Sequence, residues 1–317
     1  EPAELPPLTG HGGWVQQVEF SPDGKTVFSL DSWGQLCAWP YEAEQPQPVW
    51  KNDTAHDGWI FDLSLSADGQ RLATVGRDGF VRVWSAGDGK LVRELPRHEH
   101  QLCRVALHPD GLSLVSGDLF GTLRHFDLKT GELVRERTYE KLHYYQRIQD
   151  VPGIYVLEFH DEGRTLLCGG GQPTKTGNHF GVPTLHLVDW KTFEPTTTRH
   201  YGEDRFGFVF DLAWHPDGYF AMVTSGAPGA GQFLLARPED EKPFFTSTKF
   251  ANCHSIALSP TGTEVIVAAT NKGHQGNGAV RNKDGTYRGN TSPLHVFSLA
   301  PPAEDAEKEK AATPAKG

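Results

Sequence analysis

Polar residues at a similar depth in several predicted strands are the first candidates for chemistry in this chain. They are Gln17, Asp62, Arg104, Asp211 and Ser255. A metal site or an acid–base pair needs such side chains to converge from different elements. An aspartate that pairs with Arg104, or that accepts hydrogen bonds from backbone amides, is the simpler explanation. We therefore expect no catalytic residue and no metal site at these positions.

Other catalytic motifs are incomplete. Residues 171–176 resemble a phosphate-binding loop, but no glycine precedes Lys175, so the cradle of backbone amides is missing. His98 and His100 lie too close in sequence to form a zinc-binding pair on a helix. A serine–histidine–aspartate triad leaves no mark in spacing, so that chemistry stays open. We expect a protein without enzymatic activity and without a cofactor.

Composition narrows the range of partners. The 317 residues include 40 acidic and 30 basic side chains, a formal net charge of −10, which argues against a nucleic-acid partner. No apolar run reaches the roughly 18 residues of a membrane span, so we expect no membrane insertion. The four cysteines lack paired spacing and are expected to be buried thiols. The sequence starts at Glu1, and removal of an export signal from a soluble protein is one explanation.

These side chains must be positioned by short strands. Residues 55–84 contain three alternating apolar runs separated by Asp68-Gly69 and Asp78-Gly79, which is typical of strands joined by tight turns. The first of these turns recurs 42 to 55 residues apart along the chain, with glycines at Gly24, Gly69, Gly111, Gly163, Gly218 and Gly262. That period is typical of the four-stranded blades of a propeller. The chain is predicted to be all-β.

A second pattern links histidines to aromatic residues. A histidine lies thirteen residues before the turn glycine in the first three repeats, and each of these repeats ends in Trp39, Trp84 or Phe126. The chain thereby resembles the WD-repeat (WD40) β-propeller family, as a divergent, bacterial-like member. The resemblance implies a structural hydrogen-bond tetrad of His56, Thr74, Asp78 and Trp84. Repeats one and three keep a serine but have Trp33 and Phe120 in place of the aspartate.

The family layout implies an architecture for the whole chain. Six repeats predict six four-stranded blades over residues 1–300, although seven is the commoner number in the family. Residues 4–8 are expected to form the outer strand of the last blade and so close the ring, which removes exposed sheet edges. Residues 301–317 are rich in Ala, Pro, Glu and Lys and are predicted to be a disordered tail.

Deviations from the period indicate where function lies. Residues 138–152, 169–184, 225–231 and 270–293 are insertions in connections that the family layout places on one face. The three longer insertions carry seven basic and three acidic residues, whereas the whole chain is acidic. Aromatic residues and arginine are favoured at binding hot spots. The predicted partner-binding residues are Trp14, Trp59, Tyr144, Tyr145, Arg147, Lys175, His179, Arg281 and Arg288.

We therefore predict a non-catalytic interaction scaffold that binds a protein partner on the face of the insertions of blades four to six. The excess of basic residues there favours an acidic segment as the ligand, and the partner is expected to be such a protein or a subunit of a larger complex. The alternative is a propeller enzyme, or a binder of a small ligand or metal, that uses the central channel.

Overall fold

The computed structural model describes residues 5–146, 149–151, 153–174, 181–227, 229–270, 280–281, 283–284, 287–288 and 293–299. The chain divides into two compact units, one of residues 1–179 and 184–200, the other of residues 180–183 and 201–317. Each unit is built from antiparallel sheets. None of the described helices is long and apolar enough to cross a membrane.

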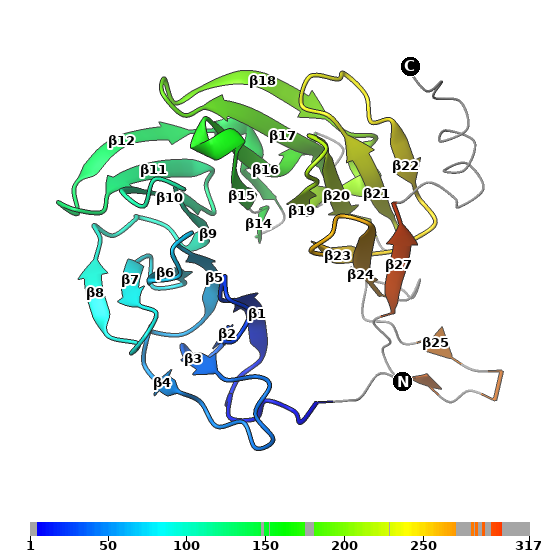
Figure 1. Cartoon of the computed structure of the whole chain (residues 1–317). Helices are drawn as coiled ribbons and strands as arrows, with labels where there is room; N and C mark the ends of the chain where they lie inside the picture. Colours follow the sequence, from blue (N-terminus) through cyan, green and yellow to red (C-terminus); the bar gives the residue numbers. More distant parts are fainter. Residues whose placement is uncertain are drawn as a thin grey trace, which may run out of the picture. The chain divides into compact units, whose positions relative to one another are not determined.

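The first unit holds four blade sheets, each with its strands hydrogen-bonded in sequence order (Figure 1). The first two sheets consist of β1 (Val15–Phe20), β2 (Val27–Asp31), β3 (Leu36–Trp39) and β4 (Trp50–Asn52), then β5 (Ile60–Leu65), β6 (Arg71–Gly76), β7 (Val81–Ser85) and β8 (Leu91–Glu94). The next two consist of β9 (Leu102–Leu107), β10 (Ser113–Asp118), β11 (Thr122–Asp127) and β12 (Leu133–Thr138), then β15 (Ile154–His160), β16 (Thr165–Pro173), β17 (Gly181–Asp189) and β18 (Glu194–His200). Strand β17 begins with the few residues that are grouped with the second unit.

The second unit holds the fifth and sixth blade sheets. The fifth contains β19 (Phe208–Trp214), β20 (Phe220–Ser225), β21 (Gly231–Ala236) and β22 (Phe245–Ser247), and the sixth contains β23 (Cys253–Leu258), β24 (Glu264–Ala269) and β27 (Leu294–Ser298). The predicted all-β propeller of six blades is confirmed. Residues 5–8, predicted to add a fourth strand to the last sheet, do not form a strand, so ring closure by this segment is not confirmed. The predicted tail lies outside the described residues.

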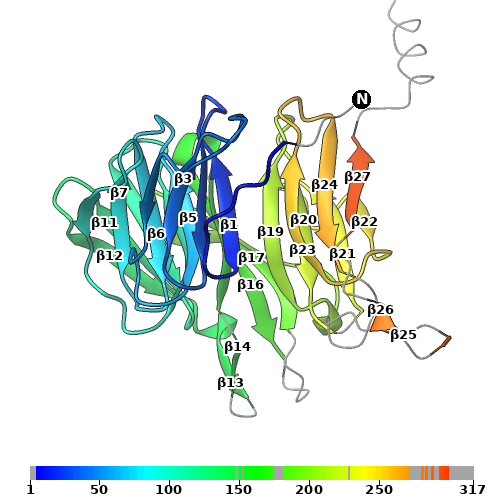
Figure 2. The same ribbon diagram turned by 90° about the horizontal axis from the view of Figure 1, so that it is seen from below.

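Short elements occupy the connections. Two small hairpins are formed by β13 (Tyr144–Gln146) with β14 (Gln149–Val151), and by β25 (Val280–Arg281) with β26 (Tyr287–Arg288). The 3₁₀ turns are η1 (Glu140–Leu142), η2 (Asp161–Gly163) and η3 (Asp204–Phe206). Within the first unit, hairpin β13–β14 projects beyond the ends of the blade strands (Figure 2).

Hydrophobic cores lie between neighbouring sheets of the same unit. Phe28 and Leu30 of the first sheet pack in one cluster with Ile60, Leu72 and Trp84 of the second. Comparable clusters join the second sheet to the third, the third to the fourth, and the fifth to the sixth. Because each sheet buries its apolar face only against a neighbour, a single repeat cannot be stable alone.

Two histidines fasten the turns of neighbouring blades. His108 Nε2 donates to the carbonyl oxygen of Gly163 at 3.0 Å, and its Nδ1 accepts from the backbone amide of Asp110 at 3.1 Å. The His108 ring also stacks on Trp190 with centroids 4.9 Å apart. In the second unit, His215 donates in the same way to the carbonyl of Gly262 at 2.7 Å. The sequence signal is a repeated His-Pro-Asp-Gly at residues 108–111 and 215–218, whose glycines mark the turns and whose histidines make these contacts.

Candidate functional site

The tetrad residues of the second blade are brought together as one buried network. His56 Nδ1 lies 2.9 Å from the ionised carboxylate of Asp78, which can only accept, so Nδ1 carries the ring hydrogen and donates it. His56 Nε2 then accepts from the hydroxyl of Thr74 at 2.8 Å, and Trp84 Nε1 donates to the same hydroxyl oxygen at 2.8 Å. The chain of bonds ties the loop before β5 to strands β6 and β7.

Burial and hydrogen bonds fix the protonation states of His56 and Asp78 in this network. Burial lowers the pKa of His56 and outweighs the opposing effect of Asp78, so the imidazole stays neutral at pH 7. Burial also opposes ionisation of Asp78, but hydrogen bonds from His56 and Arg82 hold the pKa of its carboxyl well below the usual range. Thr74 is 0% exposed and His56 is 4% exposed, so a substrate cannot reach the hydroxyl or the imidazole. The arrangement is structural.

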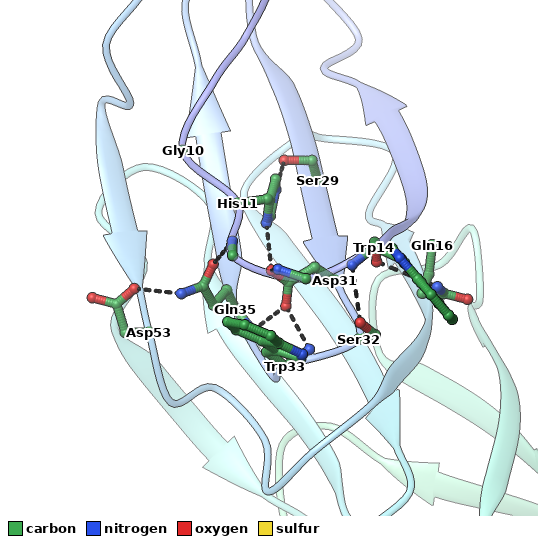
Figure 3. A network of polar contacts seen from close by, with 12 residues as sticks. Gly10, His11, Trp14, Gln16, Ser29, Asp31, Ser32, Trp33, Gln35 and Asp53 are labelled. Atoms are coloured by element: carbon green, nitrogen blue, oxygen red, sulfur yellow. Dashed lines mark hydrogen bonds and ion pairs between the residues drawn. The ribbon is translucent and has the colours of Figure 1, made fainter.

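The first and third blades take the acidic member of the network from a different position. His11 lies 2.6 Å from Ser29 and 3.0 Å from Asp31 (Figure 3). Trp39 donates to the same Ser29 hydroxyl at 2.7 Å. In the third blade, His98 likewise lies 2.8 Å from Ser116 and 3.3 Å from Asp118. Asp31 and Asp118 end the second strand of their sheets, two residues before Trp33 and Phe120. Trp33 and Phe120 do stand at the sequence position of Asp78, but each network keeps its acid, because Asp31 and Asp118 lie beside the histidines.

Steric room decides which position can hold the aspartate. The second blade has Gly76 at the end of β6, where a Cβ would lie 2.7 Å from His56 Nδ1. An acid there would collide with the histidine that Asp78 already binds. In the first blade, Asp31 instead accepts from the amides of Trp33 and Gln35 and ties down the turn itself. Although burial opposes ionisation, these backbone hydrogen bonds keep the pKa of Asp31 below its usual value.

Moving the acid frees the turn position for an aromatic side chain. Trp33 is 67% exposed at the tip of the β2–β3 turn. Nearby, Trp14 is 73% exposed and meets the ring of Trp59 edge-on, with centroids 5.9 Å apart. We call the ends of the sheets where these residues lie the loop face. In an antiparallel blade this is the end at which the first strand begins and the second meets the third.

Of the four predicted insertions, two contain hairpins, one lengthens a pair of strands, and residues 225–231 only join β20 to β21. Residues 138–152 contain hairpin β13–β14, where Tyr145 is 61% exposed. Residues 169–173 and 181–184 belong to β16 and β17, which are nine residues long each. Residues 270–293 contain hairpin β25–β26.

The remaining predicted binding residues have these positions. Tyr144, Arg281 and Arg288 lie in β13, β25 and β26 respectively. Arg147, Lys175 and His179 lie outside the described residues.

The polar residues of the first strands join blades together. Asp62 on β5 accepts from the amide of Val105 on β9 at 2.7 Å, and Asp211 on β19 accepts from that of Ile256 on β23 at 2.9 Å. Gln17 on β1 bonds both the amide and the carbonyl of residue 63 on β5. Arg104 on β9 donates to the carbonyl of residue 155 on β15. We call these contacts the strand clasps. Ser255 donates to Asp211 at 2.8 Å, so each of the five polar residues that first suggested catalysis has a hydrogen-bond partner within the fold.

A metal-binding arrangement is not found among these side chains. In the described part of the chain, no three His, Cys, Asp or Glu residues form a group that could hold a metal ion. The four cysteines are buried and free, and burial raises the pKa of Cys37, Cys103 and Cys253 to about 12. These thiols stay protonated and unreactive at pH 7.

Glu19 on β1 gives the fold a measurable pH dependence. Burial, together with the charge of Asp62, raises its pKa from 4.5 to about 7. The folded protein then holds a proton that the unfolded chain has released, so this stabilisation is complete below about pH 4.5 and is lost as the pH rises through 7.

Glu19→Gln should therefore raise the free energy of unfolding by about 2 kcal/mol at pH 8 and change it little at pH 4.5. Urea unfolding at a series of pH values measures the difference. The exposed Glu132→Gln serves as the control, and an effect of Glu19→Gln that is equal at every pH would refute the assignment.

Comparisons with known proteins agree with this architecture. The family model "WD domain, G-beta repeat" matches residues 4–39 and 48–85. The chain is 28% identical over 172 residues to the guanine nucleotide-binding protein subunit beta of Oryza sativa subsp. indica, which covers 51% of this chain and 43% of the relative. It is 29% identical over 128 residues to human WD repeat-containing protein 90, or 40% of this chain and 7% of that protein.

A solved structure extends the likeness to the fold of the second half. The structure of U3-55K superposes with a TM-score of 0.64 at 13% identity, covering 83% of this chain and 76% of that one. The chain thus spans less than half the length of the curated relatives that it matches. Nothing in these likenesses tests the expected bacterial-like character. Together, the two repeats that match the family model, the histidine networks and the six blade sheets support a WD-repeat β-propeller.

Proposed function

We propose that this propeller is a non-catalytic scaffold that binds a protein partner on its loop face. The observation that carries the proposal is the exposure of large aromatic side chains there: Trp14, Trp33 and Tyr145 are all more than 60% exposed. Exposed tryptophan and tyrosine are costly in water and are the residues that most often dominate binding energy. The plant relative is named as a subunit of a guanine nucleotide-binding protein, which supports a role within an assembly.

The insertions of blades four to six are proposed as the specific part of this surface. Their basic residues favour an acidic segment of the partner, because opposite charge speeds encounter and selects the register of binding. Arg147 and Arg281 belong to different insertions, so each can be tested by itself. The polar residues of the first strands, which could have supported an enzyme, are occupied by the strand clasps.

We expect Trp14→Ala with Tyr145→Ala to reduce partner capture at least tenfold, since each truncation removes an exposed aromatic anchor. Crosslinking and mass spectrometry in the native cell identify the partner, and a binding assay with that partner measures the loss. Leu112→Ala is the matched control, because Leu112 is 62% exposed at the β9–β10 turn, at the other end of its blade. Equal capture by the aromatic variant and the control would rule out the loop face.

Charge reversal separates the acidic-partner proposal from the aromatic one. Arg147→Glu and Arg281→Glu should each weaken capture and leave the melting temperature nearly unchanged. Lys129→Glu and Lys191→Glu, at exposed strand connections elsewhere, have the same charge change. If these controls weaken capture as much as the arginine variants, the effect is one of total charge and the acidic partner is wrong.

A further inference from the structure

A cavity of about 250 Å³ lies between the second and third blades, at the end of the sheets opposite to the loop face. Pockets that enclose a whole small molecule start at about 300 Å³, so this one has room for a single side chain. The residues that line it belong to β6, β7, β8 and the β11–β12 turn, and they are Arg71, Val83, Val92, Arg93, Leu128 and Lys129.

One residue of the fourth strand fastens each of the first three blades to the next. It pairs across the sheet with the residue that precedes the aromatic member of the histidine network, and it is Trp50, Arg93 or Arg135. In all three blades its side chain donates to backbone carbonyls in the turn before the fourth strand of the following blade. The three junctions are therefore built on one plan and can be compared position by position.

Aromatic rings fill the junction of the third and fourth blades. Cζ of Arg135 lies 4.8 Å from the ring centroid of Trp190 and 4.6 Å from that of Phe193. His125 packs on the same Trp190, with centroids 4.4 Å apart. Phe193 has φ of +61°, a conformation that is unfavourable for any residue except glycine, so its packing holds it there. The first junction also has a ring, because Trp50 is itself the fastening residue.

The junction of the second and third blades has small side chains at these positions. Val83 stands where the next junction has His125, and Leu128 stands where it has Trp190. The residue equivalent to Phe193 is Gly131. The cavity therefore lies where the neighbouring junctions hold an aromatic ring.

The described residues that line the cavity include three cations and no carboxylate. Arg71 and Arg93 donate to neutral backbone carbonyls of the third blade. The carboxylates of Asp68 and Asp127, which act electrostatically on Arg71 and Lys129, accept hydrogen bonds from groups of their own turns. In a chain with a net charge of −10, the cavity is thus a locally basic site.

We propose that this cavity binds an aromatic side chain of a protein partner, from a segment in which acidic residues flank the aromatic one. The ring packs on Val83 and Leu128 and lies against the Arg93 guanidinium, in the way that Trp190 lies against Arg135. The flanking carboxylates pair with the exposed cations at the rim, because opposite charge selects the register of binding. The inference goes beyond the proposed function, which concerns the other end of the blades.

The test uses the peptide acetyl-Glu-Trp-Glu-amide, carrying 5-fluorotryptophan, and the intact protein. Addition of the protein should shift and broaden the fluorine NMR resonance of the peptide in a saturable way. The unlabelled peptide should reverse this change by competition. Acetyl-Glu-Leu-Glu-amide, which lacks the ring, and acetyl-Gln-Trp-Gln-amide, which lacks the charges, should each need about fivefold higher concentrations.

Leu128→Trp fills the cavity from within and copies the next junction, where Trp190 stands at this position. It should abolish the saturable change, while the melting temperature stays equal or rises, which separates blocking from misfolding. Leu294→Trp introduces the same side chain at a position that is 67% exposed in the second unit. This control should bind the peptide as the wild type does.

Charge at the rim is tested by Arg71→Gln with Lys129→Gln, which should weaken binding about fivefold. Arg77→Gln with Lys242→Gln is the charge-matched control, because both residues are exposed and neither lines the cavity. Binding by the control variant should equal that of the wild type.

The inference is wrong if the fluorine resonance shows no saturable change, or if either altered peptide competes as well as the original. It is also wrong if Leu128→Trp binds as the wild type does, or if both charge variants weaken binding equally. None of these outcomes bears on the loop face, so the two proposals fail separately. Because Lys129 lines this cavity, Lys191→Glu is the control that reports total charge alone in the loop-face experiment.

Discussion

Asp31→Ala is expected to lower the free energy of unfolding by about 3 kcal/mol. Its side chain is fully buried and accepts from the ring of His11 and from the amides of residues 13, 33 and 35. Removing the carboxylate leaves these donors without a partner and releases the β2–β3 turn. Urea unfolding of the intact chain measures the loss.

A more specific experiment moves the carboxylate by two residues and asks whether stability is recovered. Asp31→Gly with Trp33→Asp reproduces the arrangement of the second blade, where Gly76 ends the strand and Asp78 supplies the acid. The double variant should recover most of the stability that Asp31→Gly alone loses. Trp33→Asp alone, which places a second carboxylate beside Asp31, should not stabilise. If the double variant is no better than Asp31→Gly, the two positions are not equivalent sources of the acid.

Gly163→Ala is expected to cost about 3 to 4 kcal/mol, the second large effect. Gly163 has φ of +89°, and an added Cβ would lie 2.2 Å from Nε2 of His108. The substitution therefore strains the backbone and also displaces the ring that fastens the third blade to the fourth.

Gly111→Ala isolates the first of these two effects. Gly111 has a similar φ of +68° but no atom within 4 Å of its Cβ position, so only the backbone strain of about 1 kcal/mol applies. Removing the ring in His108→Ala with Gly163→Ala should relieve the collision, so the two changes should combine to less than their sum. Equal costs for the two glycine variants would show that the His108 contact contributes nothing.

The blade repeats could be predicted from the sequence because the residues that mark their turns and strands are close together in the chain. A turn glycine such as Gly24, with φ of +69°, needs no tertiary context to be recognised, and alternating apolar residues mark each strand. The acid at Asp31 was missed because alignment by spacing compares sequence positions, whereas the histidine selects whichever carboxylate reaches its Nδ1. Two positions two residues apart satisfy the same geometry.

The candidate site was readable only in part. Trp14 and Tyr145 were predicted as contacts, and both are highly exposed. The stacked rings of His100, Phe120 and His143 come from three separate loops, so no short sequence motif predicts the stack. The strand clasps were equally hidden, since a side chain that bonds a neighbouring backbone leaves no mark in the sequence of that neighbour.

The strand clasps all run in the same direction along the chain. In each case the side chain belongs to the earlier blade and the backbone group to the later one, as between Asp62 and Val105. The earlier blade must supply a suitable side chain. The later blade supplies only a backbone group, which is present whatever its sequence. A substitution at the bonded position of the later blade, other than to proline, should therefore leave a clasp intact, whereas a substitution of the side chain in the earlier blade should break it.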